Sequence, residues 1–421
     1  MKRLITALIV ASLSISALAQ SGLKTREPES HGMDSGKLAQ IDKVVKNAIE
    51  AKEIPGAVIS VVRDNEIVFL KAYGNKSVVP YVEPMGKETV FDLASVSKCV
   101  GTTLSFMQLI ENGLVRLTDN VERYIPDFKP WKDPETGETV DITVRDLLTH
   151  SSGLSPYINT NAFVNEYGEN NPDELEKYIA TAVKRNFRPG SDFMYSCLNF
   201  ITLQRILEKV TGKKLYEYAQ EHIFDVLGLR HTCYFPLASD PAAANASELK
   251  SLCAPTEVQA DGKPLLAQVH DPIARRVMSG NSGNAGVFSN AGDLSVICAA
   301  IMNGGALSDK KGRPLERTRI LSPATVRLMT TVPSENDPSV GRALGWDKNS
   351  SHSGLRGDLF NPETTIMHTG YTGTSIVIDL ESKTAIVLLT NRVHPKDKGA
   401  VGRLRALVSN IVAGSIVETR E

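Results

Sequence analysis

Hydrophobic positions recur at three- and four-residue steps through residues 91–113, and the rest of the chain is organised around this stretch. Leu104, Met107 and Ile110 fall on one side of a helix with this period, so the pattern predicts a buried amphipathic helix. Glycine commonly follows the last turn of a helix, and Gly113 stands at that position. We therefore expect a buried helix that ends at Gly113.

Strand patterns occur near both ends of the chain. Runs rich in β-branched residues predict strands, and the Asp64-Asn65 pair between the first two runs is a hairpin signal. A second hairpin is predicted at 381–384, between two of the later runs. The predicted strands are 56–63, 66–73, 365–368, 375–380 and 385–390, and the predicted terminal helices are 34–51 and 399–413.

The middle of the chain, about 114–264, alternates short helical patterns with loops rich in Pro, Gly and Asn. We therefore predict an α/β fold in which strands from both chain ends form one antiparallel sheet, flanked by the N- and C-terminal helices. The α/β part would cover about 35–113 and 265–421, and the middle would be a mainly helical insertion. A substrate cleft is expected where these two parts meet.

The N-terminus has the pattern of a secretory signal peptide. Lys2 and Arg3 precede an apolar run over residues 4–15, and Ala17-Leu18-Ala19 forms a small-residue cleavage site. We expect cleavage after Ala19 and therefore export, to the periplasm rather than to the medium. No later apolar run is long enough to span a membrane and no cysteine follows the cleavage site, so no stable membrane anchor is expected.

Charge argues against nucleic acid as a partner. Without Lys2 and Arg3 the basic count falls from 47 to 45 against 48 acids, a net charge of −3, and no basic tract stands out. Five cysteines leave at least one thiol free, and Cys233 with Cys253 is the best candidate for a disulfide. Nothing in the pattern suggests an oligomer, and we expect a monomer.

Candidate chemistry begins with Ser95 and Lys98, which lie three apart at the start of the predicted buried helix. Residues three apart share a helix face, so the amine could take the proton of the hydroxyl and activate it as a nucleophile. Burial and the positive end of the helix dipole both disfavour a lysine cation, and we expect Lys98 to act as a base. Other Ser-x-x-Lys pairs, at 21/24, 247/250 and 308/311, lie in polar stretches and are read as solvated surface.

Two further motifs could complete such a site. Tyr195 follows a turn at 188–191, and its hydroxyl could relay a proton between a nucleophile and a leaving group. His368-Thr369-Gly370 opens a predicted strand, where glycine allows close approach of substrate and backbone amides can help form an oxyanion hole. His150 is read as a structural, hydrogen-bonding histidine.

These motifs, taken in order, resemble the three signatures of the serine β-lactamases and penicillin-binding proteins: Ser-Val-Ser-Lys at 95–98, Tyr-Ser-Cys at 195–197 and His-Thr-Gly at 368–370. A second motif that begins with tyrosine resembles that of one branch of the family, the class C β-lactamases, DD-peptidases and esterases. Supporting matches lie at 54–57, 147–154, 283–289 and 344–346, so the resemblance covers about residues 35 to 415.

The resemblance implies an acyl-enzyme mechanism. Ser95 would attack an ester, amide or lactam carbonyl, Lys98 and Tyr195 would transfer protons, and the backbone N–H groups of Ser95 and Tyr371 would hold the oxyanion. His368, Thr369 and Gly370 would bind substrate. No metal or organic cofactor is implied. The substrate would be a small-molecule or peptidoglycan-type acyl compound.

Two departures from the family pattern bear on the substrate. The second motif usually ends in asparagine, but Cys197 stands there, and Asn199 two positions later is a candidate to compensate. The third motif usually begins with a lysine that anchors a carboxylate, but His368 stands there and is mostly neutral at pH 7. Both changes argue against an efficient β-lactamase and suit an esterase, a peptidase with unusual specificity, or an acyltransferase that passes an acyl group to an alcohol.

Two alternatives remain open from the sequence. One is a β-lactamase or a cell-wall D-Ala-D-Ala carboxypeptidase. The other belongs to a different class of protein, a penicillin-binding or sensor module that is acylated without turnover. Turnover distinguishes a sensor from an enzyme, because a sensor would remain acylated.

Overall fold

The computed structural model describes residues 22–235, 247–351 and 353–417. The predicted signal peptide, residues 1–19, lies outside this part of the chain. Among the described residues, no helix is long and apolar enough to cross a membrane.

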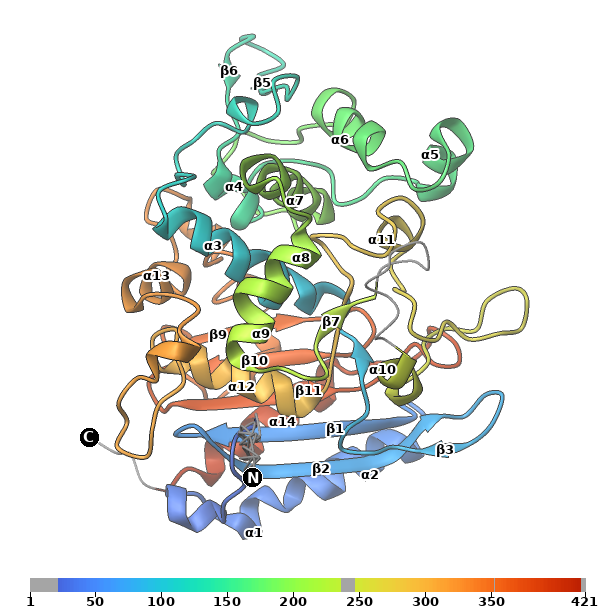
Figure 1. Ribbon diagram of the computed structural model, residues 1–421, viewed down its shortest axis with the longest axis vertical. Helices are drawn as coiled ribbons and strands as arrows, with labels where there is room; N and C mark the ends of the chain where they lie inside the picture. Colours follow the sequence, from blue (N-terminus) through green and yellow to red (C-terminus); the bar gives the residue numbers. More distant parts are fainter. Residues whose placement is uncertain (1–21, 236–246, 352, 418–421) are drawn as a thin grey trace, which may run out of the picture.

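A six-stranded antiparallel sheet forms the base of the molecule, in the order β3-β2-β1-β11-β10-β9 (Figure 1). Its two halves come from opposite ends of the chain and join where β1 pairs with β11, with Val58 opposite Leu389 and Val61 opposite Ile386. This arrangement confirms the predicted α/β fold with an antiparallel sheet. The strands are β1 (Gly56–Arg63), β2 (Glu66–Ser77), β3 (Glu83–Pro84), β9 (Thr365–Thr369), β10 (Ser375–Asp379) and β11 (Thr384–Leu389).

Helices cover both faces of this sheet. The terminal helices α1 (Ser35–Leu38), α2 (Gln40–Glu50) and α14 (Gly402–Ser415) pack on one face, and α12 (Ala291–Met302) contacts β1 and β11 on the other. The predicted helix at 34–51 is divided, because Ala39 separates α1 from α2. Every side chain of β1 is buried, as expected for a strand covered on both faces.

A mainly helical region lies on the α12 side of the sheet (Figure 1). One hydrophobic core runs through both regions, since it includes Val58 of β1 and Leu203 of α7. The boundaries proposed near 114 and 264 stay a prediction. The helices here are α3 (Leu104–Glu111), α4 (Val144–Leu148), α5 (Thr160–Tyr167), α6 (Pro172–Thr181), α7 (Cys197–Thr211), α8 (Leu215–Ala219) and α9 (Asp225–Leu227).

Smaller elements complete the fold. A three-stranded sheet in the order β4-β8-β7 joins distant parts of the chain, and β5 pairs with β6. These remaining elements are β4 (Phe91–Asp92), β5 (Trp131–Lys132), β6 (Thr139–Val140), β7 (Cys233–Tyr234), β8 (Val287–Ser289), α10 (Ser247–Leu252), α11 (Pro272–Arg276) and α13 (Pro323–Met329).

All five cysteines are free thiols, so the predicted Cys233–Cys253 disulfide is wrong. Cys253 is buried in a small apolar cluster with Phe235 and Phe288, and Cys233 packs against the same cluster. The Cys253 thiol donates to the carbonyl of Leu249 at 3.3 Å instead of bonding to the second sulfur. The pair is therefore part of the apolar packing.

Candidate active site

The turn that carries Ser95 links β4 to the buried helix α3. Ala94, just before the serine, has a φ of 46°, which is uncommon for a residue other than glycine. Asp92 holds this conformation, because its carboxylate accepts the N–H of Ala94 at 2.9 Å and that of His270 at 2.7 Å. The predicted helix begins as a 3₁₀ turn at Ala94–Val96, continues as a π-helical turn at Lys98–Thr103 and becomes α-helical only in α3.

Ser95 lies at a pocket of about 340 Å³. The third motif contributes His368, Thr369, Gly370 and Tyr371 to the wall of this pocket. The structure thus brings together three motifs that are far apart in the sequence. The complete lining consists of Ser95, Tyr195, Arg342, Asp347, Met367, His368, Thr369, Gly370, Tyr371, Arg392 and Arg405.

The ammonium group of Lys98 is fully buried and uses each of its three donors. Its Nζ donates to Ser95 Oγ at 3.0 Å and to the carbonyl oxygen of Asn284 at 2.9 Å. The third contact is with Cys197 Sγ at 3.5 Å. Three acceptors around three N–H bonds fix both the position and the orientation of the amine.

The protonation of Lys98 differs from the expectation. Burial disfavours the Lys98 cation, but the neighbouring Cys197 and Tyr195 groups outweigh burial, and the pKa of Lys98 is raised above its usual value. Burial also raises the pKa of Tyr195, an effect that the Lys98 charge opposes. The prediction of a lysine with a lowered pKa is therefore wrong.

Tyr195 packs against both Lys98 and His150. Lys98 Nζ is 4.9 Å from the centre of the Tyr195 ring, and the His150 ring packs on that ring with 4.3 Å between centroids. His150 Nδ1 accepts the N–H of Ser196 at 3.1 Å, which places the ring proton on Nε2. Burial, followed by the nearby Arg342 and Lys98 charges, lowers the pKa of His150 well below its usual value. His150 is thus neutral and supports the tyrosine.

The third motif brings backbone close to the nucleophile. A side chain at Gly370 would place its Cβ 2.3 Å from the carbonyl oxygen of Leu93, so only glycine fits there. His368 is buried, and its Nδ1 lies 2.9 Å from the carbonyl oxygen of Thr369. Burial, followed by the Arg342 and Lys98 charges, lowers the pKa of His368 well below its usual value. His368 is therefore a neutral residue at the position where the family has a cation.

Tyr371 forms the outer rim of the pocket and is 56% exposed. Its ring lies between the His270 ring, with centroids 5.7 Å apart, and the Arg392 guanidinium, 4.7 Å from the ring centre. Its hydroxyl donates to Asp397, which also pairs with Arg392. The oxyanion role expected of its backbone N–H, and the substrate-binding roles of residues 368–370, stay predictions.

Asn199 does not take the place of the missing second-motif asparagine. Its Oδ1 accepts the Ser152 hydroxyl at 2.6 Å, and its Nδ2 lies 3.3 Å from His150 Nδ1. Two residues advance a helix by about 200°, so Cys197 and Asn199 point to nearly opposite sides of α7. The suggestion that Asn199 compensates is wrong. Of these two residues, only Cys197 contacts Lys98.

Several residues at the site were not singled out from the sequence. Asn284, inside the 283–289 match, provides the carbonyl that accepts from Lys98, and Arg342 and Asp347 line the pocket together with His368. Arg342 stands two positions before the Leu344-Gly345-Trp346 match, which is the nearest available signal. Arg392 and Arg405 also line the pocket, so its lining contains three arginines and one aspartate.

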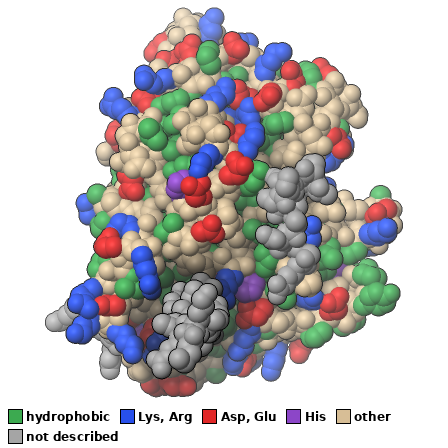
Figure 2. All heavy atoms as spheres, in the orientation of Figure 1, with side chains coloured by type: hydrophobic (Ala, Val, Ile, Leu, Met, Phe, Trp, Pro, Cys, Tyr) green, Lys and Arg blue, Asp and Glu red, His purple; other side chains and the backbone are tan. Residues whose placement is uncertain are grey.

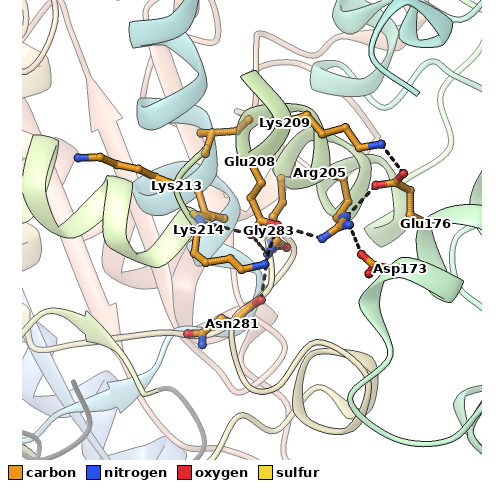
Figure 3. A network of polar contacts seen from close by, with 12 residues as sticks. Asp173, Glu176, Arg205, Glu208, Lys209, Lys213, Lys214, Asn281 and Gly283 are labelled. Atoms are coloured by element: carbon orange, nitrogen blue, oxygen red, sulfur yellow. Dashed lines mark hydrogen bonds and ion pairs between the residues drawn. The ribbon is translucent and has the colours of Figure 1, made fainter. Parts of the chain in front are cut away.

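A polar network outside the pocket fixes the segment that holds Lys98 (Figure 3). Gln204 on α7 accepts the N–H of Gly283 at 2.7 Å and donates to the carbonyl of Asn281 at 3.1 Å. Its Nε2 also donates to Glu208 at 3.0 Å. The residue after Gly283 is Asn284, so this network positions the carbonyl that accepts from Lys98. The ion pairs behind it are Arg205 with Asp173, Glu176 and Glu208, Lys209 with Glu176, and Lys214 with Glu208.

Comparison with known proteins agrees with this geometry. The Beta-lactamase family profile matches residues 41–410. A protein of Escherichia coli K12 named "Putative D-alanyl-D-alanine carboxypeptidase" is 32% identical over 414 residues, which cover 94% of this chain and 92% of the relative.

Solved structures share the fold at lower identity. The hydrolase EstCE1, described as having promiscuous acyltransferase activity, aligns with a TM-score of 0.67 and 24% identity over 90% of this chain and 99% of its own. A penicillin-binding protein homologue from Pyrococcus abyssi aligns with a TM-score of 0.63 and 22% identity over 90% and 76%. The profile and the curated relative span most of the chain, and the protein therefore belongs to the Beta-lactamase family of serine hydrolases.

Proposed function

We propose that the protein forms an acyl-enzyme through Ser95. The observation that carries this proposal is the 3.0 Å hydrogen bond from Lys98 Nζ to Ser95 Oγ at the open pocket, with Tyr195 alongside. When the Lys98–Tyr195 pair has lost a proton, it can accept the proton of the serine hydroxyl as the Oγ–carbonyl bond forms. The pair then returns that proton to the leaving group. Water attacks the acyl-enzyme in the second half-reaction and releases the acid.

Ester cleavage remains the favoured reaction within this mechanism. Cys197 offers no amide to bind a peptide side chain, and His368 is neutral where the family has lysine. Both features remove contacts that an efficient β-lactamase uses. An ester also has a better leaving group than an amide, so it depends less on these contacts.

The second candidate function is D-alanyl-D-alanine carboxypeptidase activity. The observation that favours it is the name of the curated relative, with 32% identity over nearly the full length of both proteins. We also propose that the protein is exported to the periplasm and acts there as a monomer. The N-terminal pattern of Lys2, Arg3 and an apolar run supports the export step.

Intact-mass spectrometry tests the proposed mechanism. The purified protein is incubated with a short aryl ester, with a penicillin and with a D-alanyl-D-alanine peptide. We expect a transient mass gain with the ester that is absent in Ser95→Ala. Ser308→Ala is the matched control, because it removes the serine of another Ser-x-x-Lys pattern. Unchanged ester turnover in Ser95→Ala would refute the mechanism. A penicillin adduct that persists without turnover would favour a sensor.

A further inference from the structure

We propose that Thr372 and Thr374 are positioning residues of the acylation reaction. Their hydroxyls hold the turn after the third motif against the segment before Ser95. The separation of these two segments sets the distance between the N–H groups of Ser95 and Tyr371, which are expected to hold the oxyanion. The inference rests on the proposed function and deepens it, because it gives a role in that reaction to two buried threonines that do not line the pocket.

Residues 370–374 form a closed turn that begins at the last residue of the third motif. The N–H of Gly370 donates to the carbonyl of Thr374 at 2.7 Å, and the N–H of Gly373 donates to the carbonyl of Gly370 at 3.1 Å. Tyr371 lies inside this turn, and its N–H has no acceptor among the described residues. The position of that donor therefore depends on what holds the turn in place.

Two hydroxyls of the turn bind consecutive carbonyls of the opposite segment. Thr372 Oγ1 donates to the carbonyl oxygen of Asp92 at 2.7 Å. Thr374 Oγ1 donates to the carbonyl oxygen of Leu93 at 2.8 Å. The two threonines are 1% and 0% exposed, so water does not compete for either contact. The two carbonyls belong to the residues that lead into the turn of Ser95.

The two segments are in close contact at this point. A Cβ on Gly370 would lie 2.3 Å from the Leu93 carbonyl oxygen and 2.1 Å from Thr374 Oγ1. A hydroxyl can approach a carbonyl oxygen to 2.7 Å, as Thr372 does, because a hydrogen bond joins them. A methyl carbon stays about 3.3 Å or more from an oxygen, so a valine in place of threonine would separate the segments by about half an ångström.

Arg405 of α14 fixes the shape of the turn itself. Its Nη2 donates to the carbonyl of Gly370 at 3.1 Å and to the carbonyl of Thr374 at 2.7 Å. These are the same two carbonyls that accept the N–H groups closing the turn. The turn is therefore held as one unit, and the threonine hydroxyls that cross to the Ser95 segment set where that unit lies.

The consequence concerns the transition state more than the bound substrate. Negative charge develops on the carbonyl oxygen only as Ser95 Oγ bonds to the carbonyl carbon, so donors aimed at that oxygen lower the barrier without strengthening substrate binding equally. A displacement of 1 Å can cost about 100-fold in rate, so half that displacement should cost about 10-fold. Loss of a threonine hydroxyl should consequently lower kcat and leave KM nearly unchanged.

Valine substitutions test the proposal, because they remove one hydroxyl at nearly constant shape. We expect kcat for a short aryl ester to fall about 10-fold or more in Thr372→Val and in Thr374→Val, with KM within about twofold of the native value. Thr372→Ser keeps the hydroxyl and should hold kcat within about threefold of the native value. Thr372→Ala removes the hydroxyl without adding bulk and should show the same division between kcat and KM.

The matched control is Thr330→Val, at the end of α13. The Thr330 hydroxyl also donates to a backbone carbonyl, that of Val326 at 3.0 Å, and the residue is 5% exposed and outside the pocket lining. This variant should keep the native kcat. Thermal unfolding followed by circular dichroism shows that each variant is folded. A native kcat in the folded Thr372 and Thr374 variants, or an equal loss in Thr330→Val, would overturn the proposal.

Phenylboronic acid separates this proposal from the mechanism. Its boron bonds to Ser95 Oγ and becomes a tetrahedral anion, which imitates the oxyanion intermediate, while the serine proton passes to solvent. Calorimetry should show an affinity about 10-fold or more weaker in Thr372→Val than in the native protein, and native affinity in Thr330→Val. That result supports the positioning role even if no ester is turned over, in which case only the proposed function fails. Equal affinity in Thr372→Val, or no binding to the native protein, would refute the positioning role and leave the acyl-enzyme mechanism to its own test.

Discussion

At the scale of single residues, the site depends on a lysine with every donor engaged. Lys98 holds Ser95, Cys197 and the carbonyl of Asn284 at once, so it can accept the serine proton only after losing one of its own. The pKa values of Lys98 and Tyr195 are both raised, so that loss becomes easier as the pH rises.

The rate of acylation should consequently rise with pH. Both groups of the pair have raised pKa values, so the basic form is scarce at pH 7 and increases as the pH rises. We expect kcat/KM for a neutral ester to climb from pH 6 to pH 10, by up to about tenfold per unit. Initial rates are measured with a neutral aryl ester, and Ser95→Ala gives the background hydrolysis. A plateau reached by pH 7 would contradict the raised pKa values.

Residue types and order were sufficient to identify Ser95, Lys98 and Tyr195 as a group. They did not predict the orientation of the Asn199 side chain, because that orientation depends on the residue at which α7 begins. Arg342 could not be found from sequence, since an isolated arginine carries no signal until the fold buries it beside the pocket. The environment of Lys98 was misjudged for a similar reason, since Cys197 and Tyr195 come from a distant segment.

At the scale of elements, the helices α6 and α7 support the segment that holds Lys98 from outside the pocket. Gln204 contacts both Asn281 and Gly283, just before Asn284, and its own side chain donates to Glu208. The ion pairs around Arg205 join α6 to α7 behind this contact. The position of the Lys98 acceptor therefore depends on a residue outside the pocket lining.

Gln204→Met tests this positioning role. The substitution keeps most of the volume but leaves the buried N–H of Gly283 without an acceptor, which should cost about 1–3 kcal/mol of stability. We expect kcat to fall about 10-fold or more with little change in KM, because a small displacement of the reacting groups has a large effect.

Lys209→Gln is the matched control on the same helix. It removes one partner of a surface ion pair, and such pairs contribute about 1 kcal/mol or less. A Gln204 variant with normal kcat and lowered stability would show that the network serves the fold alone.

Runs of β-branched residues predicted β1, β2, β9, β10 and β11, and amphipathic patterns predicted the terminal helices, with small errors at the ends. They did not reveal α12, because nearly all of its side chains are buried and it has no polar stripe to set its period. The sequence patterns also did not predict the π-helical turn at Lys98–Thr103, since the path of that turn is set by tertiary contacts.

At the scale of the whole molecule, the two ends of the chain share one sheet and one side of the core. The cluster that contains Leu388 of β11 also contains Val45 of α2 and Val408 of α14. Lys, Arg, Asp and Glu side chains are interspersed over the face shown in Figure 2, in keeping with a formal net charge of −1.

Leu388→Ala should destabilise the molecule without altering its chemistry. The side chain is 1% exposed in a cluster covered by α2 and α14, so its truncation should cost about 2–5 kcal/mol. Urea unfolding followed by circular dichroism measures this loss, and kcat at 15 °C should stay within about twofold of the native value because Leu388 does not line the pocket. Leu328→Ala, at an exposed position on α13, should change stability by less than about 0.5 kcal/mol. A large fall in kcat for Leu388→Ala would contradict this separation.

The pairing of β1 with β11 also determines when the protein can fold. β1 is among the first elements to be synthesised, but its partner strand is completed only near the end of translation. Contacts between segments so distant in the chain form late, because a long loop must close before they are made. The nascent chain therefore has an incomplete sheet for most of its synthesis. For a protein that we propose is exported, this delay is useful, because an unfolded chain can pass through a narrow membrane channel that a finished sheet could not enter.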